Sequence, residues 1–285
     1  MLTARDDARD LTVRTEDGIS LKARWWACPS PRGTLVLAHG LGEHGGAYRH
    51  VAEQVGRSLE VDVVAFDFRG HGLSPGRRGV VSRYDDLVAD LRSVISWAHA
   101  RRPDRPVFVL GHSNGGQVAL RLALEAPTSL GGVAVSNPSI RIGIQVPAWK
   151  LALGKALLAL APWITLKAEA PSEWMTRDPE MQASYRRDGL RHGRISAPLF
   201  FGMIEGGEML LRRAAEIRVP SLLIVGGQDP VISPLATREF FQALGSEDKT
   251  LLLYPRMLHE PFNEIGRQQV IEDLIRWLDS RLDPR

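Results

Sequence analysis

The sequence predicts an α/β protein in which a mostly parallel, eight-stranded sheet carries helices on both faces and a helical insertion after its sixth strand. Short apolar runs, typical of strands buried on both faces, alternate with segments of helical period. This alternation stops between about Asn137 and Arg218 and then resumes. The 285 residues are 44% hydrophobic and 24% charged, which suffices for a sizeable core. Alternating strands and helices favour right-handed crossovers and a parallel sheet.

The N-terminal part of the sheet is expected to be a hairpin, because β-leaning runs within Leu11–Cys28 flank the turn signal Glu16-Asp17-Gly18. The strands that follow are expected at Thr34–Ala38, Asp62–Phe66, Val107–Leu110, Gly132–Ser136, Pro220–Val225 and Thr250–Tyr254. Helical spacing of apolar residues predicts helices at Ser82–Ala100, directly after Ser113, at Pro234–Leu244 and at Glu264–Leu282. We therefore expect a core of residues 1–137 and 219–285 and a cap of residues 138–218.

The cap contains an unusual segment, because Val146–Ile164 is apolar nearly all round and is interrupted only by Lys150 and Lys155. Two interpretations remain open. The segment either forms a lid that covers an apolar pocket and also touches a membrane surface, or it is an ordinary buried helix. Further helical segments are expected near Met181–Arg187 and Gly206–Ala215.

Composition excludes several classes of protein. The 36 basic and 33 acidic residues are scattered, and no basic stripe is interleaved with aromatic residues, so nucleic-acid binding is not expected. The single Cys28 excludes an intramolecular disulfide, and no residue cluster has zinc-ligand spacing. Met1–Asp10 lacks the apolar region of a signal peptide, and no apolar run is long enough for a transmembrane helix. We expect a cytoplasmic protein without a structural metal site, and nothing indicates its oligomeric state.

Ser113 lies where a strand turns sharply into a helix, in Gly111-His112-Ser113-Asn114-Gly115. This layout is typical of a nucleophile elbow, which holds a serine hydroxyl clear of the backbone at strained angles. Glycine at both flanks avoids Cβ atoms that would collide as the strand folds back over the helix. The alternative is a serine that merely caps a helix.

A glycine-rich loop, His39-Gly40-Leu41-Gly42-Glu43-His44-Gly45-Gly46, follows the strand Thr34–Ala38. The backbone amide of Leu41 could face the amide of Asn114, at the first turn of the next helix, so that the two donors form an oxyanion hole. The alternatives are a phosphate-binding loop or a tight turn. A nucleotide site is disfavoured because Gly40-Leu41-Gly42 lacks the last glycine of a dinucleotide fingerprint and no Gly-Lys-Ser/Thr follows.

A serine nucleophile needs a base, and the base needs an acid that holds its tautomer. Asp229 and His259 both follow predicted strands, and the order Ser113, Asp229, His259 is that of α/β-hydrolase triads. Two sets of residues compete for these roles. His39, His44, His71 and His112 are interpreted as local hydrogen-bonding residues, and Asp67 as a brace for the turn that follows it.

Five segments together resemble the monoacylglycerol lipase and lysophospholipase branch of the α/β-hydrolase superfamily: His39–His44, Phe66–Ser74, Gly111–Gly116, Gly226–Pro230 and His259-Glu260. The resemblance implies the α/β-hydrolase fold and a capped serine esterase that acts on acylglycerols, lysophospholipids or similar long-chain esters. It implies Ser113 as nucleophile, His259 as base and Asp229 as its orienting acid, with the amides of Leu41 and Asn114 as oxyanion hole. It further implies no cofactor and a cap that contributes an acyl tunnel.

The sequence departs from this family at Asn114, where methionine is common. A polar side chain on the pocket floor there would alter substrate preference rather than chemistry. Two further hypotheses stay open. The same triad could cleave an amide, a peptide or a non-lipid ester, or the fold could be catalytically silent and serve for binding.

Overall fold

The computed structural model describes residues 8–168 and 170–282, so residues 1–7 of the polar N-terminal segment lie outside it. Eight strands of the described chain form one sheet in the order β1-β2-β4-β3-β5-β6-β9-β10. Their bounds are β1 (Arg9–Arg14), β2 (Ser20–Trp26), β3 (Thr34–Ala38), β4 (Asp62–Phe66), β5 (Val107–His112), β6 (Gly132–Ser136), β9 (Ser221–Gly226) and β10 (Lys249–Tyr254). The hairpin β1-β2 is antiparallel, β2 joins β4 antiparallel, and all other neighbours are parallel. The predicted sheet is confirmed.

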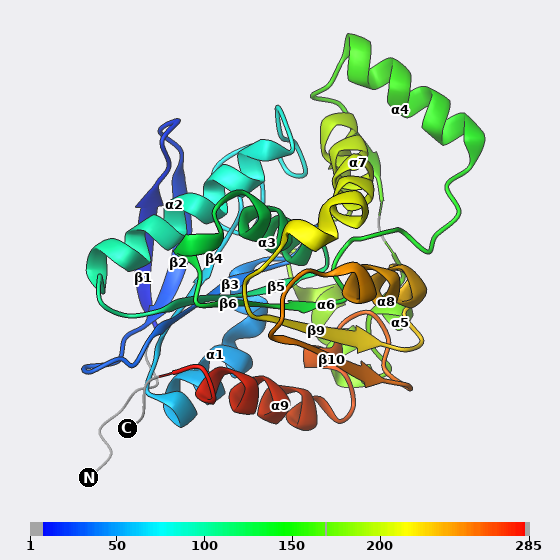
Figure 1. The fold of residues 1–285 in the computed structure, drawn as a ribbon. Helices are drawn as coiled ribbons and strands as arrows, with labels where there is room; N and C mark the ends of the chain where they lie inside the picture. Colours follow the sequence, from blue (N-terminus) through cyan, green and yellow to red (C-terminus); the bar gives the residue numbers. More distant parts are fainter. Residues whose placement is uncertain (1–7, 169, 283–285) are drawn as a thin grey trace.

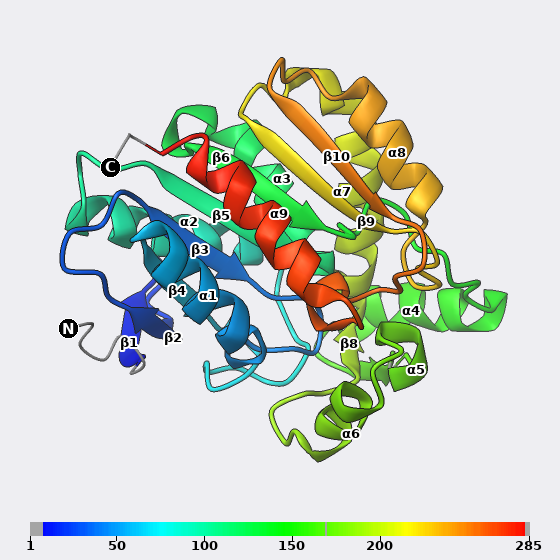
Figure 2. The same cartoon turned by 90° about the horizontal axis from the view of Figure 1, so that it is seen from below.

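Helices cover both faces of the sheet (Figures 1 and 2). On one face lie α1 (Arg49–Leu59) and α9 (Arg267–Asp279); on the other lie α2 (Asp85–Arg101), α3 (Ser113–Glu125) and α8 (Pro234–Ala243). Each face has its own apolar core, because side chains of the central strands alternate between the two layers. Short 3₁₀ turns lie at η1 (Gly45–Tyr48), η2 (Pro127–Ser129), η3 (Ala214–Glu216) and η4 (Pro261–Asn263).

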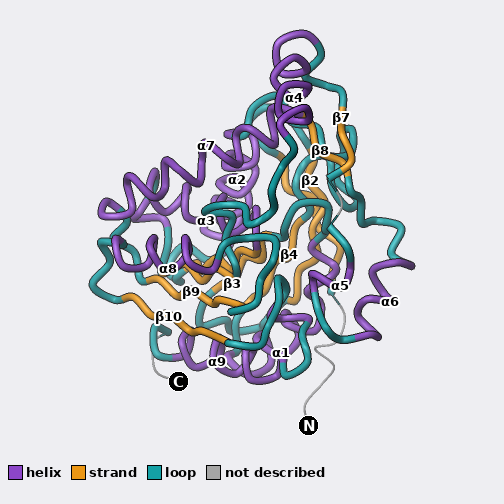
Figure 3. The backbone as a smooth tube through the Cα atoms, turned by 90° about the vertical axis from the view of Figure 1, so that its right-hand side faces the viewer, coloured by secondary structure: helices purple, strands orange, loops and turns teal. Residues whose placement is uncertain are grey.

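The chain between β6 and β9 forms the inserted cap (Figure 3). Its elements are α4 (Ala148–Leu160), β7 (Thr165–Lys167), α5 (Ser172–Met175), α6 (Pro179–Arg187), β8 (Arg194–Ser196) and α7 (Ala197–Arg213). The structure differs from the sequence prediction at two places in the cap. The last cap helix begins at Ala197 rather than near Gly206, because Pro198 suits the first turn of a helix. The antiparallel pair β7-β8 was not expected, since three-residue strands carry no periodic signal.

Helix α4 projects away from the sheet and rests on α7 (Figure 1). Gly154 is its one buried residue, close to the Phe201 ring, whereas Trp149 and Leu160 are 64% and 80% exposed. The alternative of an ordinary buried helix is therefore wrong. Within the described ranges, no helix combines the length and the apolar character that crossing a membrane requires.

Candidate active site

Ser113 is the first residue of α3, directly after β5. Its φ of 51° lies in the left-handed region, which costs an L-residue roughly 1–3 kcal/mol and marks functional sites. The flanking glycines make this turn feasible. A Cβ at Gly111 would lie 2.5 Å from the Gly115 carbonyl oxygen, and a Cβ at Gly115 would lie 2.2 Å from that of Ala38. The strained turn lifts the hydroxyl to the carboxyl end of the sheet.

The structure brings Ser113, His259 and Asp229 together. The hydroxyl of Ser113 lies 3.0 Å from Nε2 of His259, and Nδ1 of His259 donates to Oδ2 of Asp229 at 2.7 Å. The other carboxylate oxygen, Oδ1, accepts the backbone amides of Val231 and Ile232 at 2.7 and 3.0 Å. Both oxygens of Asp229 are thus fixed, so the imidazole is held with Nε2 directed at the serine.

The environment of His259 adjusts its basicity. Burial by itself would lower the pKa of this imidazole, but the charge and hydrogen bond of Asp229 outweigh burial and raise the pKa above its ordinary value. The carboxylates of Glu260 and Glu43 act in the same direction. His259 is therefore a better proton acceptor than a free histidine.

Asn137 is a positioning residue that the sequence analysis missed. It follows β6 with a φ of 42°, and its Nδ2 donates to the carbonyl oxygens of Leu258 and His259 at 3.1 and 2.8 Å. Its Oδ1 accepts the amide of Gly226, the last residue of β9. One side chain therefore ties the histidine loop to the strand that precedes Asp229. Its position after a buried strand, like that of Asp229, was the available signal.

The glycine-rich loop lies beside Ser113, and Leu41 and Gly42 line the same cavity as the serine. Gly42 has a φ of 74°, and its carbonyl oxygen accepts the amide of His192 from the cap at 2.9 Å. The amide of Gly40 donates to Oε2 of Glu43 at 2.9 Å. These contacts hold the backbone around Leu41 in one conformation.

Asn114, the second residue of α3, offers one of the helix's first amides, which have no partner within their helix. Its side chain points elsewhere, since its Oδ1 accepts the Tyr84 hydroxyl at 2.7 Å. Asn114 is not one of the described residues that line the cavity. The expectation of a polar group on the pocket floor is wrong.

The competing histidines have local partners. His39 accepts the Phe68 amide at 3.1 Å, His71 bonds the Arg69 carbonyl oxygen, and His44 pairs with Asp188 of the cap. His112 donates to the Ser136 carbonyl oxygen at 3.1 Å. Burial, assisted by the nearby His259, lowers the pKa of His112 to about 3, so this residue is neutral near pH 7.

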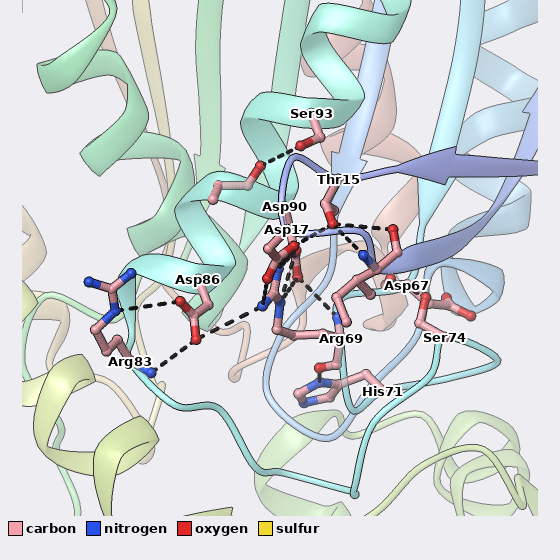
Figure 4. Close-up of polar contacts among 12 residues, drawn as sticks. Thr15, Asp17, Asp67, Arg69, His71, Ser74, Arg83, Asp86, Asp90 and Ser93 are labelled. Atoms are coloured by element: carbon pink, nitrogen blue, oxygen red, sulfur yellow. Dashed lines mark hydrogen bonds and ion pairs between the residues drawn. The ribbon is translucent and has the colours of Figure 1, made fainter.

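Asp67 accepts the amides of Gly45 and Leu73 at 2.7 Å each, so it braces the glycine-rich loop as well as its own turn. Next to it, Arg69 pairs with Asp90 and Asp17 (Figure 4). These contacts fix the strand-end loop that the cap rests on. Asp67 therefore has the bracing position that its sequence context indicates.

One group of described side chains has the spacing of metal ligands: Glu43, His112 and Glu260 bring ligand atoms within 4.8 Å of one another. The Arg191 guanidinium already pairs with both carboxylates. A cationic side chain thus supplies the charge that a metal would bring, and this set does not fit a metal ion.

A cavity of about 950 Å³ opens over Ser113 and His259, between the sheet and the cap. Most of its wall is apolar, with Leu41, Ile142, Ile144, Val146, Leu166, Trp174, Met175, Ile195, Phe200, Phe201, Met203, Val231 and Ile232. Polar side chains gather mainly on the cap side, with Lys150, Lys167, Tyr185, Arg186, Asp188, Arg191 and His192. The cavity has the size and the lining to hold a long apolar group whose end lies at the Ser113 hydroxyl.

Comparisons with known proteins agree with this geometry. Residues 29–266 match the family described as serine aminopeptidase, S33. The chain is 34% identical over 259 residues to a monoacylglycerol lipase of Mycolicibacterium smegmatis, covering 90% of this chain and 92% of that protein. It is 29% identical to the monoglyceride lipase of Rattus norvegicus, covering 93% and 89%. The crystal structure of Paleococcus ferrophilus monoacylglycerol lipase superimposes with a TM-score of 0.83 at 29% identity, covering 96% and 99%.

These matches span nearly the whole chain and confirm the resemblance that the sequence motifs indicated. They also agree with the eight-stranded sheet and its surrounding helices. The chain therefore belongs to the serine aminopeptidase S33 family and is an enzyme, a serine hydrolase with the α/β-hydrolase fold.

Proposed function

We propose that the enzyme hydrolyses monoacylglycerols, lysophospholipids or similar long-chain acyl esters through an acyl-enzyme on Ser113. The hydrogen-bonded series Ser113, His259, Asp229 at the floor of a largely apolar cavity carries this proposal. The substrate class rests on that lining and on the names of the relatives, which are lipases of monoacylglycerols. The cavity volume of about 950 Å³ accommodates a long acyl chain.

In the proposed mechanism, the Ser113 oxygen attacks the ester carbonyl carbon while His259 Nε2 accepts the hydroxyl proton. The amides of Leu41 and Asn114 stabilise the negative oxygen of the tetrahedral intermediate. His259 then donates its proton to the departing alcohol, and the acyl group stays on Ser113. Water, deprotonated by His259, attacks the acyl-enzyme and releases the fatty acid, which restores the serine hydroxyl.

The first test is Ser113→Ala, for which we expect the hydrolysis rate of a monoacylglycerol to fall by about a million-fold. A fluorophosphonate probe should label the native protein and not the variant. Ser93→Ala is the matched control, because Ser93 bonds only within its own helix at Ala89. Near-full esterase activity in Ser113→Ala would show that Ser113 is not the nucleophile. Failure of the probe to label the native protein would favour the silent fold.

A second candidate function, cleavage of an amide or peptide bond, is favoured by the description of the matching family as an aminopeptidase. Rates against monoacylglycerols and lysophospholipids of increasing chain length, aryl esters and aminoacyl anilides separate the two. We expect the long-chain esters to be cleaved fastest. A short-chain optimum contradicts the lipid assignment, and preferred cleavage of anilides establishes the alternative.

We also propose that residues 138–218 act as a separate cap that touches lipid surfaces transiently. Its support is the exposed apolar surface of α4 and the following turn, beside two lysines. The residues concerned are Trp149, Leu153, Leu158, Leu160, Trp163 and Ile164, with Lys150 and Lys155. Amphipathic surfaces of this composition lie in the headgroup region of membranes.

A further inference from the structure

Three charged side chains from three separate parts of the chain meet behind the catalytic histidine. Glu43 comes from the glycine-rich loop, Glu260 follows His259 directly, and Arg191 comes from the cap between α6 and β8. Arg191 lies 3.1 Å from Glu43 through Nη2 and 3.2 Å from Glu260 through Nη1. The two carboxylate side chains are 5% and 2% exposed and that of Arg191 is 15% exposed, so Arg191 is a largely covered bridge between two buried acids.

Neighbouring groups complete this cluster. The Tyr185 hydroxyl donates to Glu260 at 2.5 Å, and the Arg191 guanidinium lies 3.7 Å from the centre of the Tyr185 ring. On the other side, Tyr48 donates to Glu43 at 2.9 Å. Each oxygen that the cluster presents is thus held by a named donor, which distinguishes it from a mobile surface ion pair.

The charge of this cluster acts on the catalytic base. His112 lies between, with its ring centre 4.8 Å from that of His259. Burial, together with the negative charge of Glu260, raises the pKa of Glu43 to about 7. Burial opposes ionisation of Glu260 as well, but Arg191 outweighs it and lowers that pKa. The positive charge of Arg191 therefore offsets part of the negative charge that the two acids place near His259.

The ionisable groups that face His259 come from every element packed around it. Asp229 after β9, His112 at the end of β5, Glu43 after β3 and Glu260 on its own loop act on His259 directly, whereas Arg191 and Tyr185 from the cap contact Glu260. Arg191 is the permanent cation of this set. It also joins three parts of the chain at one point, beside the side-chain contacts of His44 with Asp188 and of Tyr185 with Glu260. Its removal changes both the charge and the rigidity of the histidine loop.

We propose that Arg191 is a positioning residue for the hydrolytic reaction: by bridging Glu43 and Glu260 it sets the orientation and the proton affinity of His259 from the cap. This inference rests on the proposed function of His259 as base. It makes the cap part of the catalytic apparatus rather than a cover alone.

The test uses Arg191→Met, with Arg191→Lys as the charge-conserving variant and Arg187→Met as the matched control, since Arg187 is an exposed arginine of the same cap segment. Arg191 also lines the cavity, so its loss changes one polar wall residue as well as the base. In Arg191→Met we expect kcat to fall about ten-fold or more and KM to change less than about three-fold, because the main effect is the displacement of the base. The acidic limb of the kcat profile should move up by about one pH unit, since a positive charge has been removed. Arg191→Lys should keep the native limb.

Nuclear magnetic resonance of the His259 imidazole measures the same shift without any substrate. This readout separates the two proposals, because an inactive native protein contradicts the proposed function while the imidazole titration still tests Arg191. Identical titrations and identical kcat values for Arg191→Met and Arg187→Met overturn the role of Arg191.

A double variant, Arg191→Met with Glu260→Gln, decides the matter should Arg191→Met fail to fold. It removes one charge of each sign, so we expect it to fold and to bring the His259 midpoint back toward the native value. If the double variant fails to fold, or if it folds and its His259 midpoint stays away from the native value, charge balance is not the mechanism.

Discussion

The two halves of the cap differ in how they meet the core. The segment from Asp188 to Ser196 is tied to it by backbone bonds, with the amide of His192 on Gly42 and that of Ser196 on Gly79. Within the part of the chain that the structure describes, no backbone hydrogen bond joins helix α4 to the core, and Gly154 is the one buried residue of this helix. The same insertion thus contains a part that is built into the active site and a part that projects from it (Figure 1).

This difference in attachment gives the two parts of the cap different roles. The tied segment positions groups near His259, where displacements of about 1 Å are costly to catalysis. The projecting helix presents apolar side chains to the surroundings and contacts the body of the protein through α7. We infer that substitutions in the first part change chemistry, whereas substitutions in the second change access to an aggregated substrate.

The largest effect within this comparison is expected from Gly42→Ala. A Cβ at this position would lie 2.1 Å from the His192 carbonyl oxygen, and the φ of 74° disfavours any residue but glycine. We expect kcat/KM to fall by about a hundred-fold and unfolding stability to fall by about 2 kcal/mol. Steady-state kinetics and thermal unfolding measure both.

Gly189→Ala provides the control, because a Cβ at this cap glycine meets no atom within 4 Å. It should behave like the native enzyme. If Gly42→Ala were equally harmless, the tied segment would not be part of the active site, and the comparison between the two halves would lose its basis.

A smaller effect is expected from Trp149→Ser combined with Leu160→Ser, which removes two exposed apolar side chains of α4. Hydrolysis of a dispersed short-chain ester should be unchanged, whereas hydrolysis of substrate in vesicles should fall by about ten-fold because less apolar area enters the lipid. The control pair is Leu235→Ser with Leu253→Ser, two exposed leucines outside the cap. Equal losses for both pairs on vesicles would argue against a specific role of α4.

The smallest effect concerns pH. Because Asp229 raises the pKa of His259 above 6.5 against the effect of burial, kcat/KM should be lost on acidification with a midpoint above pH 6.5. The base must be neutral to accept the proton, so a raised pKa moves this loss to higher pH. Lys150→Gln with Lys155→Gln on α4 should leave the midpoint within about 0.2 units, since exposed charges are screened. A midpoint below 6.5 contradicts the arrangement around His259.

Sequence patterns predicted the parts of the molecule that depend on local chain geometry. The turn at Ser113 needs glycines at fixed offsets, and strands such as Thr34–Ala38 are continuous apolar runs, so both are visible in a short window. The candidate triad was accessible for a related reason, because polar residues that follow parallel strands meet at one edge of the sheet. The pair β7-β8 was not accessible, since its three-residue strands carry no periodic pattern and exist through their pairing with each other.

By itself, therefore, the sequence determined the sheet, the elbow and the identity of three residues that meet at the carboxyl edge. Tertiary structure alone decided that Arg191 lies between Glu43 and Glu260, and that Asn137 holds the His259 loop. The physical reason is distance along the chain. Arg191 and Glu43 are 148 residues apart, and such a contact depends on how the cap is folded back onto the loops, which no local pattern encodes.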